Sequence, residues 1–151
     1  MIKFQEYLNK GLLKTQNPNF KQIEKQIVRA EKDLCTFNLV IDNDPEWAST
    51  MVYQAMLRAG RSLLFSYGFL PADGQQHKTV IEITGKILGQ KFGLLIKQFD
   101  RLRKKRNVFF YDSEDTHNFT EAKNAIVTAR ELINEVKRKI NAFNPQQTFK
   151  L

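Results

Sequence analysis

The sequence predicts an all-α fold, an up-and-down antiparallel bundle of four to five helices with a short N-terminal helix or arm. Three observations indicate this fold. The 151 residues have the usual size of one domain, and 42% of them are hydrophobic, so the chain can bury a core. Only four prolines and seven glycines interrupt it. Apolar residues recur at the three- and four-residue spacing of amphipathic helices, and no segment convincingly predicts a strand.

The first long helix follows an N-terminal arm. We expect residues 1–16 to form this arm, residues 17–144 the helical bundle, and residues 145–151 a polar tail. Asn17 is predicted to cap the first long helix, with Pro18 at its first position. The apolar stripe of this helix consists of Phe20, Ile23, Ile27, Ala30, Leu34 and Phe37.

The second long helix is predicted to begin at Asp44 and Pro45, with Asp44 as the cap, and to end near Tyr67. Glu46 in its first turn favours the positive end of the helix dipole. Its apolar residues include Trp47, Met51, Ala55, Met56, Leu63 and Leu64. The glycines and proline in "GFLPADGQQ" then predict a loop.

Three further helical segments complete the predicted bundle. A shorter helix is expected from His77 to about Gly89, and the helical period resumes from Phe92 to about Phe110. The last helix should begin near Thr120. Its stripe consists of Ala122, Ile126, Ala129, Ile133, Val136, Ile140 and Phe143.

Composition narrows the function classes. A net charge of +8 makes polyanions plausible partners, because a positive field raises the local concentration of phosphate-bearing molecules. Cys35 is the only cysteine, which excludes an intramolecular disulfide and a cysteine metal cluster. The N-terminus is too charged for a signal peptide, and no stretch of about 18 apolar residues exists. We therefore expect a cytoplasmic protein with no membrane partner.

The stretch "DRLRKKRNVFFYD" (100–112) holds five Lys and Arg residues within six positions. At about 100° per residue, Arg106 falls on the apolar arc of the helix. Arg103, Lys104 and Lys105 point in other directions, as expected of a solvated helix surface. A guanidinium on an apolar face needs compensation, either in a cleft or interface or through a salt bridge to a neighbouring helix. Both explanations stay open for Arg106.

Three segments occur together in the order and spacing of a known family. They are "VYQAMLRAGRSLLFSYG" (52–68), "HKTVIE" (77–82) and "LRKKRNVFFYD" (102–112). Over about residues 47–140 the chain resembles the HEPN family of helical domains. The resemblance implies an up-and-down bundle that is usually a homodimer and is often encoded beside a minimal nucleotidyltransferase. In many members it also implies a metal-independent endoribonuclease toxin.

The catalytic pattern of that family is an Arg followed a few residues later by His. Arg106 and Asn107 match its first half, whereas Tyr111 occupies the position of the histidine. The histidine would act as general base or acid, and the arginine would bind the scissile phosphate. Tyrosine, with a usual pKa near 10, is a poor base but can donate a hydrogen bond. Arg106 and Tyr111 are therefore the candidate catalytic residues, with His117 as an alternative.

The candidate nucleotide- or phosphate-binding residues are Arg106, Asn107, Arg103 and His77. His77 stands at the family's matching position, although a ring at a helix start can also hydrogen-bond locally. The sequence has no Gly-rich phosphate loop and no His/Cys spacing suited to zinc, so we expect no metal and no cofactor.

Two functions from different classes follow. The first is a HEPN-like binding or regulatory protein whose cleft, formed by Arg106, Asn107 and Tyr111, binds a nucleotide or RNA phosphate. The same cleft could dock a nucleotidyltransferase partner in a toxin–antitoxin-like system. The second is a metal-independent endoribonuclease toxin that pairs Arg106 with a tyrosine or a displaced histidine. The first is preferred because the base is missing. A third reading is that Arg106 only holds helices together.

Overall fold

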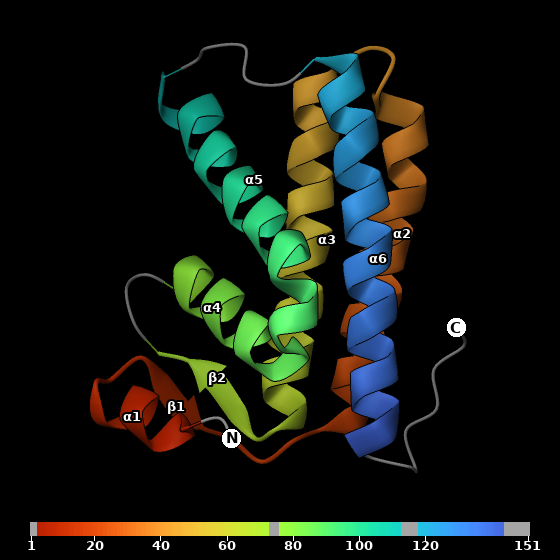
Figure 1. Ribbon diagram of the computed structural model, residues 1–151. Helices are drawn as coiled ribbons and strands as arrows, with labels where there is room; N and C mark the ends of the chain where they lie inside the picture. Colours follow the sequence, from red (N-terminus) through yellow and green to blue (C-terminus); the bar gives the residue numbers. More distant parts are fainter. Residues whose placement is uncertain (1–2, 73–75, 113–117, 144–151) are drawn as a thin grey trace.

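The computed structural model describes residues 3–72, 76–112 and 118–143, and for residues 108–112 it describes the backbone alone. Within these ranges the chain forms six α-helices, one short 3-10 helix and two short strands (Figure 1). The predicted all-α class is confirmed, since five longer helices follow a short N-terminal one.

The N-terminal segment forms a helix and a strand. After α1 (Phe4–Asn9), strand β1 (Leu13–Thr15) pairs antiparallel with β2 (Phe69–Pro71). Gly68, with a φ of +89°, turns the chain from the third helix into β2. The prediction of a chain without strands was wrong here. Two three-residue strands are too short to show an alternating pattern, and they pair only because the fold brings distant segments together.

The two long helices α2 (Phe20–Val40) and α3 (Pro45–Ser66) begin at side-chain caps. The Asp44 carboxylate accepts a hydrogen bond from the Trp47 amide at 3.0 Å, which confirms the predicted cap. The predicted cap at Asn17 is wrong by two residues. Asn19 instead accepts from the Gln22 amide at 3.1 Å, because the Gln16 amide still donates to the Gly68 carbonyl and keeps the chain extended.

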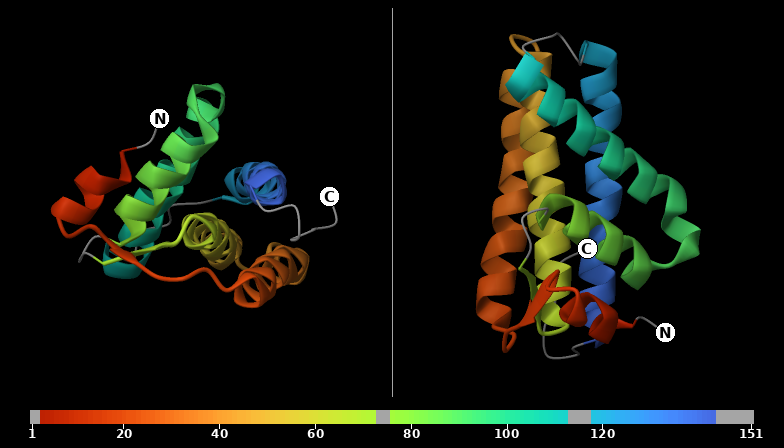
Figure 2. Two further views of the ribbon diagram at one scale, coloured as in Figure 1. Left: turned by 90° about the horizontal axis from the view of Figure 1, so that it is seen from below. Right: turned by 90° about the vertical axis from the view of Figure 1, so that its left-hand side faces the viewer.

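The three remaining α-helices begin within one residue of their predicted starts. They are α4 (Gln76–Leu88), α5 (Gly93–Asp112) and α6 (Phe119–Phe143). The short 3-10 helix η1 (Gln90–Phe92), which was not predicted, lies between α4 and α5. Figures 1 and 2 show α2, α3 and α6 side by side, with α5 crossing them obliquely above α4. Helix α3 is central, because it packs against α2, α4, α5 and α6. None of the described helices is both long enough and apolar enough to cross a membrane.

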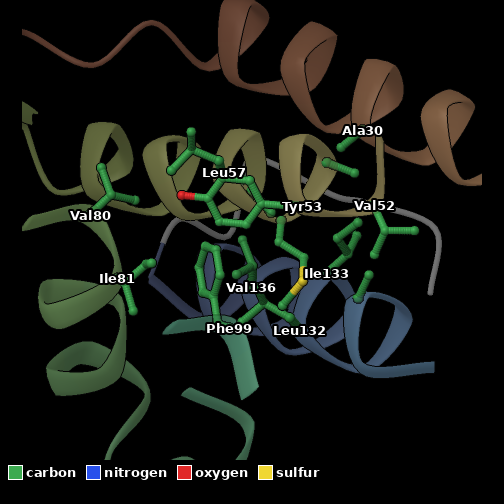
Figure 3. Packing of buried hydrophobic residues seen from close by; sticks show 14 of the residues in the cluster. Ala30, Val52, Tyr53, Leu57, Val80, Ile81, Phe99, Leu132, Ile133 and Val136 are labelled. Atoms are coloured by element: carbon green, nitrogen blue, oxygen red, sulfur yellow. The ribbon is translucent and has the colours of Figure 1, made fainter. Parts of the chain in front are cut away.

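The core lies around α3, with Tyr53 near its middle (Figure 3). The Tyr53 side chain is fully buried, and its ring meets that of Phe99 edge-on at 5.9 Å. Gly60 sets the distance between α3 and α4. A Cβ at Gly60 would lie 2.8 Å from Val80 Cγ1 and 2.9 Å from Thr84 Oγ1. Only glycine therefore allows α4 to approach α3 this closely, which places the first turn of α4 against Tyr53.

Candidate functional site

A tyrosine and a histidine pair where the first turn of α4 meets α3. Tyr53 Oη lies 3.0 Å from His77 Nδ1, and the two ring centroids are 5.8 Å apart. Burial raises the pKa of Tyr53 to about 12, so the phenol keeps its proton at neutral pH.

The buried phenol determines which nitrogen of His77 carries the proton. Among the described residues, the only hydrogen-bond partner of Tyr53 Oη is His77 Nδ1. Because a buried O–H requires an acceptor, we assign Tyr53 as the donor and Nδ1 as the acceptor. A neutral His77 ring then carries its proton on Nε2. Its second nitrogen is therefore a hydrogen-bond donor and not a base.

The charges of three arginines act on this pair. Arg61 belongs to α3, and Arg103 and Arg106 belong to α5. Burial lowers the pKa of His77, and the charges of all three arginines lower it further, so the ring is neutral at neutral pH. The same three charges oppose the raised pKa of Tyr53. The charges of all three guanidinium groups therefore act on both rings. We call these five residues the His77 site.

In the described part of the chain, the carboxylate whose charge acts on Tyr53 is that of Asp100. The carboxylate of Asp100 accepts a hydrogen bond from Arg103 Nε at 2.8 Å. Its other oxygen lies 3.2 Å from Lys104 Nζ, so this carboxylate is shared between two cations. These contacts with Arg103 and Lys104 lower the pKa of Asp100, although burial opposes the shift. Counted over the described residues alone, the site therefore keeps a surplus of positive charge.

Arg61 contributes one of these positive charges. Its side chain is half-buried, and burial lowers its pKa. It makes no hydrogen bond or ion pair with any residue in the described part of the chain. A partly desolvated guanidinium without a carboxylate is costly unless a ligand anion compensates it.

The structure brings some predicted site residues together and leaves others apart. His77, Arg103 and Arg106 belong to one cluster. Asn107 is half-buried beside Arg106, and no described contact joins it to His77. The backbone of Tyr111 belongs to α5, but its side chain is not among the parts of the chain that the structure describes. His117 lies wholly outside the described residues. The predicted pairing of Arg106 with a tyrosine or with His117 therefore stays a prediction.

The Lys and Arg residues of the stretch 101–106 differ in their surroundings. Lys104 is exposed and paired with Asp100, as expected of a helix surface, whereas Lys105 is half-buried and paired with Glu121 of α6. Arg103 was expected among the solvated residues, but only 18% of its side chain is exposed. Arg103 is bonded to Asp100 one turn earlier on α5, and its charge acts on His77 of α4, which a helical-wheel projection of one helix cannot show.

Sequence reasoning missed Tyr53 and Arg61. Both lie on α3, eight residues apart, which at about 100° per residue places their side chains about 80° apart around the helix. No pattern within α3 therefore marked them as a pair. Their partners on α4 and α5 could be found only in the folded chain.

The chemistry of the His77 site suits an oxyanion. Three guanidinium groups and the Nε2–H of His77 are all donors, and the guanidinium groups are permanently charged. No three His, Cys, Asp or Glu side chains in the described ranges are grouped so that they could hold a metal ion.

Comparison with known protein families identifies the fold. A model of the HEPN domain matches residues 23–139, which include every residue of the His77 site. No curated protein matches the chain.

Proposed function

Because the chain belongs to the HEPN family, which supports a role connected with nucleotides or RNA, we propose that the His77 site binds a phosphate group of a nucleotide or RNA without cleaving it. The single observation that carries this proposal is the half-buried guanidinium of Arg61, which has no carboxylate partner among the described residues. A bound phosphate supplies the missing negative charge.

Each group in the site has a distinct part in binding. Arg61 and Arg106 provide charge from two different helices, α3 and α5, so they can approach one phosphate from two directions. His77 donates from Nε2, and the buried Tyr53 phenol orients the ring. The bound anion also favours the imidazolium form, so binding raises the pKa of His77.

The protonation of the His77 ring argues for binding over cleavage. A general base must accept the proton of the ribose 2′-hydroxyl. The nitrogen of His77 that could accept it is occupied by the Tyr53 O–H, and the other nitrogen already holds a proton. We therefore place the chain among binding or regulatory proteins. The homodimer, the nucleotidyltransferase partner and the toxin–antitoxin-like context stay predictions from the family.

The proposal is tested by measuring the binding of a fluorescein-labelled RNA decamer by anisotropy. Arg61→Ala and Arg106→Ala should each weaken binding by about 1.5 to 3 kcal/mol, which is roughly ten- to a hundredfold. Arg101→Ala is the matched control, because Arg101 is an exposed arginine on α5 outside the cluster. Equal losses of RNA affinity in all three variants would show that the protein binds RNA through its overall positive charge, and this would overturn the proposal.

One observation favours a second function, a metal-independent endoribonuclease. His77 lies close enough to Arg106 for the arginine charge to lower its pKa, although Tyr111 fills the family's histidine position. A protonated His77 could act as an acid toward the leaving oxygen. Incubation of the protein with a mixed RNA pool in EDTA tests this function. Cleavage by the wild type that is lost in His77→Gln and Arg106→Ala would establish the nuclease and overturn the binding-only proposal.

A further inference from the structure

A cavity of about 800 Å³ adjoins the His77 site and shares Arg61 with it. The cavity lies between α2, α3 and strand β2, and we call it the amide cavity. Its charged and amide-bearing lining includes Lys25, Arg58, Arg61, Gln22, Gln26 and Gln54. No carboxylate is among its described lining residues. The volume is within the range of small-molecule binding sites.

Positive charge is present on both helical walls of the amide cavity. Lys25 projects from α2, is exposed, and has no ion pair within the described ranges. Arg58 projects from α3 and donates from Nη1 to Gln26 Oε1 at 2.6 Å. Its Nε lies 3.8 Å from Asp33, a carboxylate already paired with Arg29 at 3.1 Å. The guanidinium of Arg58 is thus oriented by Gln26 and only partly neutralised.

The rest of the lining suits a flat ring with polar edges. Leu57, Phe65 and Leu70 provide apolar surface, and Phe65 adds an aromatic face on which a base can stack. The glutamine amides present both donors and acceptors. A nucleobase has the same combination, an apolar face and an edge of donors and acceptors.

We propose that the amide cavity holds the nucleotide next to the phosphate bound at the His77 site, so that the ligand is a single-stranded oligonucleotide bound through two successive phosphates. The second phosphate is held by Lys25 and Arg58. This inference rests on the proposed function. A strand fits better than a mononucleotide, because Lys25 and Arg58 in the amide cavity add a second group of cations to those that act on His77.

The test is a chain-length series. Competition against a labelled decamer is measured with 5′-phosphorylated RNA and DNA of one to four nucleotides. The proteins are the wild type, Lys25→Ala, Arg106→Ala, and the control Lys21→Ala, an exposed lysine of α2 that does not line the cavity. The wild type should bind the dinucleotide about tenfold more tightly than the mononucleotide. Lys25→Ala should lose most of this gain and keep the mononucleotide affinity, whereas Lys21→Ala should keep both.

The outcomes separate this inference from the proposed function. If Arg106→Ala weakens mononucleotide binding but the dinucleotide brings no gain, the His77 site stands and the amide cavity is rejected. The same conclusion follows if the gain in affinity from mononucleotide to dinucleotide is the same in Lys25→Ala as in Lys21→Ala. If Arg106→Ala leaves mononucleotide binding intact, the premise itself fails and both proposals are overturned. Equal results with RNA and DNA would mean that the cavity recognises strand and base, and a preference for RNA would add the 2′-hydroxyl to the recognised groups.

Discussion

Replacing Gly60 with alanine tests how the site is assembled. The added Cβ would lie 2.8 Å from Val80 Cγ1 and 2.9 Å from Thr84 Oγ1, both well inside ordinary contact. Both neighbours have fully buried side chains, so neither can swing into solvent. Overpacking of this kind costs about 1 to 3 kcal/mol. The better helix propensity of alanine returns about 1 kcal/mol. We therefore expect a net loss of up to about 2 kcal/mol in the free energy of unfolding.

Urea unfolding followed by circular dichroism measures this loss, with Gly93→Ala as the control. Gly93 is in α5 with ordinary helical dihedrals, and a Cβ there meets nothing within 4 Å. The control should be unchanged or more stable by up to about 1 kcal/mol. Gly60→Ala should also weaken phosphate binding, since α4 must move and carry His77 away from Tyr53. A Gly60→Ala protein as stable as Gly93→Ala would refute the close-approach argument.

Three further changes have expected outcomes. The pKa of His77 is lowered in the folded state, so the unfolded chain takes up the proton more readily. The free energy of unfolding should therefore fall as pH drops below about 6.5. Urea unfolding at a series of pH values should show this fall in the wild type but not in His77→Gln. Tyr53→Phe should cost about 1 kcal/mol in the same assay, and a cost no larger than that of Tyr67→Phe would count against the buried hydrogen bond. Glu31→Gln should destabilise the fold by leaving the buried ammonium of Lys137 without its carboxylate at 3.1 Å, and Lys137→Met should restore stability to that background.

Most of the fold could be predicted from the sequence because the pattern that indicates a helix lies within the helix itself. The apolar stripe of α2 and the cap and proline of α3 each lie within one element, so a single helix shows them. The pairing of β1 with β2 joins segments separated by two long helices, and no local pattern carries that information. The choice between Asn17 and Asn19 as cap was likewise decided by the strand pairing that extends to Gln16.

The candidate site was predicted in part for the same reason. Arg106 stood out because a cation on an apolar arc is visible within one helix, and His77 stood out through the family resemblance. Tyr53 and Arg61 become part of the site only when α4 and α5 pack against α3 and bring His77, Arg103 and Arg106 to them. The substitution of tyrosine for the family's histidine suggested a site without its base. In the fold, a histidine from another helix joins Arg106, but its available nitrogen is a donor.

The most direct test of the phosphate site is the NMR titration of His77, assigned by comparison with His77→Gln. The free protein should show the tautomer protonated at Nε2 and a pKa below the usual 6.5. Saturating uridine 5′-monophosphate should raise that pKa, because the phosphate stabilises the imidazolium against the surrounding arginines. A nucleotide that binds while the pKa and tautomer of His77 stay unchanged would place the phosphate elsewhere and contradict the proposed function.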